Sequence, residues 1–148
     1  MLEEVLGCLA RRDYFSEELR QKLRHHPTDV VNRAIERAEQ MGYLNDKTAA
    51  LRAIEQNQGK SAVSLTKLSD QLKGRHASSE ALEIFATLHE EPSQIAFNIL
   101  TESKFNRNNF GSDKEKSRQI RRAAQLLSRR GFADDEIEMA LQHFFQIS

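Results

Sequence analysis

Two stretches at opposite ends of the 148-residue chain carry the same pattern, and a shift of 118 positions takes Leu2 onto Ile120 without a gap. In both copies, apolar residues at i, i+3, i+4 and i+7 spacing predict one buried helix face. An arginine pair, an aromatic residue and a polar residue then follow in the same register. The matched residues are Leu2, Val5, Leu6, Leu9, Arg11-Arg12, Tyr14 and Ser16 in the first copy, and Ile120, Ala123, Ala124, Leu127, Arg129-Arg130, Phe132 and Asp134 in the second. Such a repeat favours a protein built from stacked helical units.

The rest of the chain also predicts helices, because its apolar residues recur with helical periodicity and no segment alternates with period two. The clearest helices are expected at about residues 28–41, 47–58, 61–73, 113–129 and 134–146, with others beginning near residues 2, 16, 79 and 94. Ser16, Asp46 and Asp134 are expected to cap helix N-termini, as is Ser78 or its neighbour. The Asn-rich residues 106–112 are expected to form a loop. The sequence therefore predicts an all-α fold.

The sequence is not that expected of a membrane-spanning, secreted or disulfide-bonded protein. No stretch approaches the roughly 20 apolar residues of a membrane span, and the start of the chain lacks the positive region of a signal peptide. Cys8 is the single cysteine, which excludes an internal disulfide and favours a reducing compartment. We expect a cytoplasmic protein, without a membrane partner and monomeric.

The search for catalytic chemistry is negative. Gly59-Lys60-Ser61 resembles the end of a phosphate-binding loop, but Ile54 stands where that motif needs its first glycine. His25 and His26 are interpreted as residues that favour the negative end of a helix dipole, and the other histidines lack metal-ligand spacing. We therefore expect no enzyme, no catalytic residue, no metal and no cofactor.

Charge is segregated along the chain, although 22 basic and 22 acidic residues cancel. No acidic residue interrupts positions 118–130, and the arginines there lie opposite the apolar stripe of their helix. A solvated surface is the ordinary explanation for such a run, but a merely soluble helix would usually place carboxylates at i±4. The arginines in question are Arg118, Arg121, Arg122 and Arg129. By contrast, the helices expected near residues 79 and 94 and at 134–146 are acidic. This separation is suited to binding phosphates or a patterned protein surface.

With these residues established, the chain resembles the RecX family of bacterial recombination regulators. The resemblance is carried by residues 9–23, which include Arg11-Arg12-Asp13-Tyr14-Phe15, by residues 41–46, and by the closing Arg129-Arg130-Gly131-Phe132 with Ile137. It spans essentially the whole chain and is looser in the middle, where His76 replaces an expected glycine.

The resemblance implies three tandem three-helix repeats in an elongated, curved array, here residues 1–45, 46–91 and 92–148. It also implies that the protein binds the filament that the RecA recombinase forms on DNA. This binding would inhibit the recombinase and co-protease activities of RecA, and it includes possible direct contact with the DNA. By position, the resemblance gives as candidate contact residues Arg11, Arg12, Arg20, Lys22, Arg24, Lys67, Lys73, Arg129 and Arg130. The charge distribution adds Arg75, Arg118, Arg121 and Arg122 as candidates.

Two alternatives stay open at this point. A stand-alone nucleic-acid-binding module would lose affinity steeply as salt rises. A generic helical adaptor that uses its acidic and apolar faces would keep its binding when the arginines of residues 118–129 are replaced.

Overall fold

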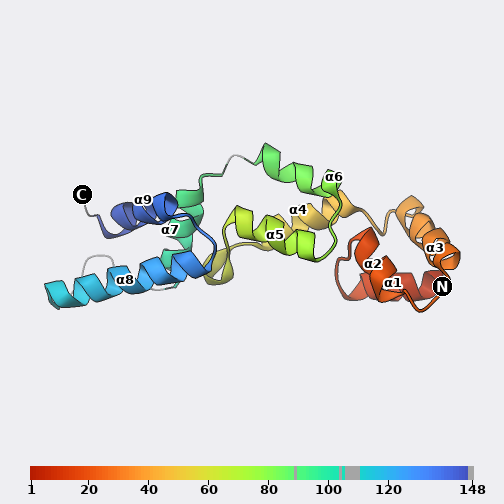
Figure 1. Cartoon of the computed structure of the whole chain (residues 1–148), viewed down its shortest axis with the longest axis horizontal. Helices are drawn as coiled ribbons and strands as arrows, with labels where there is room; N and C mark the ends of the chain where they lie inside the picture. The colour runs from red at the N-terminus through yellow and green to blue at the C-terminus, as the bar shows by residue number, and fades with distance from the viewer. Residues whose placement is uncertain (89, 104, 106–110, 147–148) are drawn as a thin grey trace. The chain divides into compact units, whose positions relative to one another are not determined.

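The computed structural model describes residues 1–88, 90–103, 105 and 111–146. It divides into two compact units: the first unit comprises residues 1–55 and 69–87, and the second comprises residues 56–68 and 88–148. Every regular element in the described part of the chain is a helix (Figure 1), which confirms the all-α prediction. No helix in these residues is long and apolar enough to cross a membrane.

The first unit begins with α1 (Leu2–Arg11), α2 (Ser16–Lys22) and α3 (Thr28–Gln40). Helix α3 packs against both α1 and α2, and the apolar stripes of the three helices meet in one core. The core side chains include Val5, Leu19 and Ile35, which have no solvent exposure.

The remainder of the first unit is formed by α4 (Asp46–Gln56), the second half of α5 (Leu65–Gly74), α6 (Ser79–Leu82) and the short 3₁₀ helix η2 (Glu83–Thr87). These elements share a second core, which contains Ala50, Leu72 and Ala81. Phe15 is completely buried in this core. The aromatic residue just before α2 therefore joins the first three helices to α4 and α6.

The second unit contains the 3₁₀ helix η1 (Gly59–Ser61), α7 (Pro92–Glu102), α8 (Asp113–Arg129) and α9 (Asp134–Phe145). Helix α9 packs against both α7 and α8 (Figure 1). Ile99, Leu127 and Phe144 come from the three helices and are fully buried in one cluster. This packing fixes which side of α8 faces the solvent.

The repeat seen in the sequence extends to the helix boundaries. Helices α1 and α8 end at Arg11 and Arg129, and α2 and α9 begin at Ser16 and Asp134, so the same 118-residue shift relates both boundaries.

At the start of α2 and at the start of α9, a backbone N–H group finds its hydrogen-bond partner in the same way. The predicted caps do not provide it. The backbone N–H of Phe15 donates to the carboxylate of Glu18 at 3.1 Å. The N–H of Ala133 donates to Glu136 at 2.8 Å. The prediction that Ser16 and Asp134 cap these helices is wrong, because the glutamate three residues after the cap position reaches back instead.

The predicted cap Asp46 has a different role. Its Oδ1 accepts hydrogen bonds from the backbone N–H and the hydroxyl of Ser16, at 2.9 and 3.0 Å, so it links the starts of α2 and α4. Asn45 takes the capping position and accepts from the N–H of Thr48 at 3.1 Å. The prediction of Ser78 as the cap of α6 is confirmed, since its hydroxyl accepts from the N–H of Ala81 at 3.1 Å.

One predicted helix, at residues 61–73, is interrupted in the structure. The Asn57 side chain donates to the carbonyl of Val63 and accepts from its N–H, both at 2.9 Å. This pair of bonds replaces the backbone pairing that a helix would make at Val63. Helix α5 therefore begins only at Leu65. The loop expected at residues 106–112 falls mostly outside the described residues.

Candidate binding surface on helix α8

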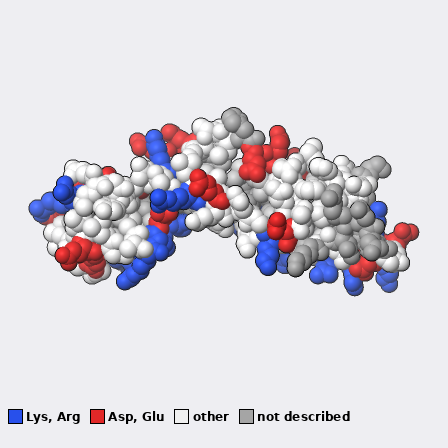
Figure 2. Space-filling model, turned by 180° about the vertical axis from the view of Figure 1, so that it is seen from behind, with Lys and Arg blue, Asp and Glu red and all other residues white. Residues whose placement is uncertain are grey.

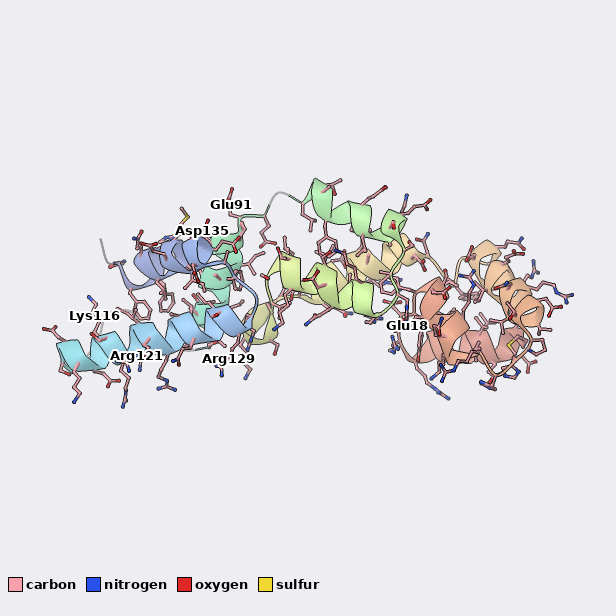
Figure 3. The ribbon with its side chains drawn as sticks, in the orientation of Figure 1. Glu18, Glu91, Lys116, Arg121, Arg129 and Asp135 are labelled. Carbon is pink, nitrogen blue, oxygen red and sulfur yellow. The ribbon has the colours of Figure 1, made fainter. Side chains whose placement is uncertain are left out.

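Helix α8 begins at a capping serine, and its buried stripe of apolar residues fixes which side faces the solvent. The Ser112 hydroxyl accepts a hydrogen bond from the N–H of Glu115 at 3.1 Å and caps the N-terminus. Ala123 and Leu127 are fully buried. Arg121 and Arg129 extend from the side of α8 that faces away from α9 (Figure 3).

The exposed side of α8 carries a row of cations, which we call the α8 basic face. Its members are all exposed to solvent: Lys114, Arg118, Arg121, Arg122 and Arg129. At 1.5 Å per residue the row extends about 22 Å along the helix. Figure 2 shows the side chains of Lys and Arg following one another along the lower edge of the second unit. A row of this kind matches an extended polyanionic or carboxylate-bearing partner better than a single small ligand.

Most of this face has no internal counter-charge. Arg118 pairs with Glu115 at 3.2 Å, one turn earlier on the helix. In the described part of the chain no carboxylate lies within 4 Å of Arg121, Arg122 or Arg129. Three guanidinium groups are thus free to form bidentate hydrogen bonds with carboxylates or phosphates of a partner.

The neighbouring helix α9 has the opposite charge. Its exposed acidic residues are Asp134, Asp135 and Glu138. The second unit therefore presents a basic surface on one helix and an acidic surface on the next. This arrangement would orient a partner of patterned charge.

The two arginine pairs of the repeat divide their roles in the same way. The second arginine of each pair bonds within its own unit: Arg12 stacks 3.6 Å above the Tyr14 ring and pairs with Glu18 at 3.1 Å. Its equivalent Arg130 donates to the carbonyls of Lys60 and Ala62, the latter at 2.8 Å. The first arginines, Arg11 and Arg129, are exposed and make no ion pair with a described residue. Among the described residues, the first arginine of each pair is therefore the one without an internal partner.

Glu18 is the electrostatic centre of the first unit, and its side chain is only 13% exposed. Besides capping Phe15, it pairs with Arg12 at 3.1 Å and with Arg75 at 3.3 Å. Burial of this carboxyl raises its pKa, but the hydrogen bonds from Arg12, Arg75 and the Phe15 N–H outweigh burial and hold the pKa below its usual value of 4.5. Arg75 also donates to the carbonyl of Asp13 at 3.1 Å, so Glu18 and Arg75 hold the first turn of α2 and the end of α5 together.

Glu18→Gln is expected to lower the free energy of unfolding by about 1–2 kcal/mol at pH 7, because charged hydrogen bonds to two half-exposed arginines are lost. The pKa of Glu18 is lower in the folded state, so its charge stabilises the fold fully above pH 4.5. That contribution disappears as the pH falls through the lowered pKa. Urea unfolding of both proteins at several pH values should show the difference shrinking below pH 4.5.

Glu17→Gln provides the matched control, since Glu17 lies in the same first turn and pairs with Arg20, but its side chain is 47% exposed. We expect a loss of about 0.5 kcal/mol or less from this variant. Equal losses in the two variants would show that the Glu18 cluster has no special role.

Some of the other candidate residues are bonded within the protein, and others are not. Arg20 bonds to Asn32 at 3.0 Å and Glu17 at 3.4 Å, and Lys67 donates to the carbonyl of Arg129. Lys73 pairs loosely with Asp70 at 3.8 Å. Lys22 lies 5.8 Å from the Tyr14 ring centroid, and Arg24 is exposed without an ion pair to a described residue.

Sequence reasoning missed two residues, one on the α8 basic face and one in the first unit. Lys114 extends the basic face by one turn, and its position four residues before Arg118 was the available signal. Glu18 was missed as a centre because its second arginine, Arg75, lies 57 positions away in the sequence.

Comparisons with known proteins add no family to this picture. No protein-family model matches the chain, and no curated protein matches it.

Proposed function

We propose that the protein is a RecX-like regulator, which binds the RecA recombinase as a filament on DNA and limits its recombinase and co-protease activities. The observation that carries the proposal is the α8 basic face, where Arg121, Arg122 and Arg129 are exposed and unpaired with described carboxylates. Unpaired arginines in a row are suited to repeated carboxylates on a protein filament or to the phosphates of its DNA.

The proposed scaffold is a series of three tandem three-helix repeats, with boundaries at residues 1–45, 46–91 and 92–148. Two features support it. The α1–α2 and α8–α9 pairs share boundaries and capping under one shift. His76, which stands where the resembled family has a glycine, has a φ of 66°, in the left-handed region that favours glycine.

In this mechanism the protein lies along the filament and makes many modest contacts, in which each exposed arginine contributes a small share. Occupying the filament surface would alter filament stability and obstruct strand exchange. The proposal places the protein in the cytoplasm with RecA and requires no cofactor or catalytic group of its own.

Co-sedimentation with RecA tests the proposal. Filaments assembled on single-stranded DNA with a non-hydrolysable ATP analogue are pelleted with increasing amounts of the protein, beside DNA alone and RecA alone. We expect saturable pelleting with the filament and much weaker binding to DNA alone. No enrichment in the filament pellet at low salt would contradict the proposal.

A stand-alone nucleic-acid-binding module is the second candidate, and the same unpaired arginines favour it. In that case binding to DNA alone should match binding to the filament. It should also weaken by about one log unit per log unit of salt for each phosphate neutralised. Comparing the two pellets over a salt series therefore separates the candidates.

A further inference from the structure

Three potential metal ligands that are distant in the sequence meet in the first unit. Glu4 lies in the first turn of α1, while His25 and His26 lie in the turn between α2 and α3. This turn is held by a hydrogen bond from the N–H of His26 to the carbonyl of Leu23 at 3.0 Å. Pro27, whose φ is fixed near −65° by its ring, follows directly before α3. The two histidines are therefore displayed from a constrained backbone.

The ligand atoms are already close together. One ligand atom from each residue lies within 4.8 Å of the other two, and His26 Nε2 is 3.0 Å from Glu4 Oε2. A tetrahedral zinc site with bonds of about 2.0–2.2 Å places its ligand atoms about 3.3–3.6 Å apart. The Glu4–His26 pair has nearly this separation, and His25 has a ligand atom within 4.8 Å of both.

His26 Nε2 gives an independent indication of a ligand. This nitrogen is buried and has no hydrogen-bond partner among the described residues. Glu4 Oε2 lies 3.0 Å from this nitrogen, at the distance of an ion pair. Buried polar atoms are normally satisfied, and a cation shared by this nitrogen and the Glu4 carboxylate would satisfy both groups.

We propose that Glu4, His25 and His26 bind a divalent transition-metal ion, with Zn²⁺ as the best match. Two imidazoles and one carboxylate form an accepted zinc ligand set, which leaves a fourth position for water. The ion would connect the first turn of α1 to the α2–α3 turn. Because the unfolded chain does not hold the three groups together, binding would stabilise the folded first unit.

Neighbouring charges set the strength of this site. Glu3, Arg11 and Lys22 line the same hollow as Glu4 and His25. The two positive charges oppose a cation and outnumber the one additional negative charge of Glu3. We therefore expect a site weaker than a four-ligand structural zinc site. Glu4 and His25 are separated by 21 positions in the sequence, which explains why sequence spacing did not indicate the cluster.

Isothermal titration of the full chain with ZnCl₂ tests the site, using protein without a polyhistidine tag and in a buffer that does not bind zinc. We expect one Zn²⁺ per chain and a zinc-dependent rise in the melting temperature. His26→Ala and Glu4→Gln should each weaken binding by at least about tenfold, since even outer-sphere substitutions cost that much at metal sites.

His76→Asn is the control, because His76 is exposed, lies outside the cluster and has a positive φ that asparagine tolerates. It should leave zinc binding unchanged. Proton NMR of the unsubstituted chain gives a second readout that needs no variant: two of its five histidine rings should shift as zinc is added. No stoichiometric binding, equal loss in His76→Asn, or equal shifts of all five rings would overturn the proposal.

Discussion

Replacing Arg121, Arg122 and Arg129 together with glutamine is expected to weaken binding to the RecA filament roughly 100-fold. Each exposed arginine contact with a carboxylate or phosphate contributes about 1 kcal/mol, and 1.4 kcal/mol corresponds to a factor of ten. Glutamine has nearly the helix propensity of arginine, so α8 should stay folded. Co-sedimentation with filaments, together with circular dichroism of the variant, measures both effects.

The matched control removes the same amount of charge elsewhere. Arg33, Arg37 and Lys47 are exposed on α3 and α4 and lie outside the candidate contact residues. Replacing all three with glutamine should change the affinity for the filament by no more than about threefold. The change in net charge alone accounts for a shift of this size. If both triple variants bind equally well, the α8 basic face is not the contact surface. An unchanged affinity of the α8 variant would favour the generic adaptor.

Gly131→Ala is expected to lower the stability of the second unit by about 2–5 kcal/mol. Gly131 has a φ of 92°, where a residue with a side chain costs about 1–2 kcal/mol. A Cβ at this position would also lie 2.6 Å from Lys67 Cβ and 2.7 Å from Ser64 Oγ. Overpacking of this kind typically adds 1–3 kcal/mol. The Ser64 hydroxyl is itself bonded to the carbonyl of Gly131 at 2.8 Å, so it cannot move away without losing that bond.

Gly59→Ala separates the cost of the positive φ from the cost of the steric clash. Gly59 belongs to the same unit and has a φ of 75°, but a Cβ there would have no atom within 4 Å. We expect a loss of about 1–2 kcal/mol, from backbone conformation alone. Urea unfolding of both variants measures the difference, and equal losses would show that the close approach of residues 64 and 67 to Gly131 does not matter.

The sequence predicted the helices well wherever a long amphipathic stripe decided the structure. The bounds of α8 agree with the prediction at residues 113–129, because Ile120, Ala123 and Leu127 define one face and Ser112 and Gly131 flank it. The register between the two ends of the chain also held in the structure, since the boundary residues Arg11 and Arg129 match under the same shift.

The errors occurred where a side chain takes a hydrogen-bond partner that its residue type alone does not reveal. Ser16 is a suitable cap by type, but Asp46 takes both its N–H and its hydroxyl. The interruption before α5 depends on Asn57 reaching Val63. Likewise, nothing local separates Arg130 from Arg129, and only the carbonyls of Lys60 and Ala62 show that Arg130 is used internally. Such choices depend on tertiary contacts, which single-sequence patterns do not contain.

ATP hydrolysis by RecA on single-stranded DNA tests the central claim most directly. The protein is titrated into a steady-state reaction at fixed RecA and DNA, beside the variant with glutamine at positions 121, 122 and 129. We expect inhibition that increases progressively until the filament is saturated, with the variant requiring far higher concentrations. Unchanged hydrolysis up to filament saturation would contradict the assignment as a RecX-like regulator.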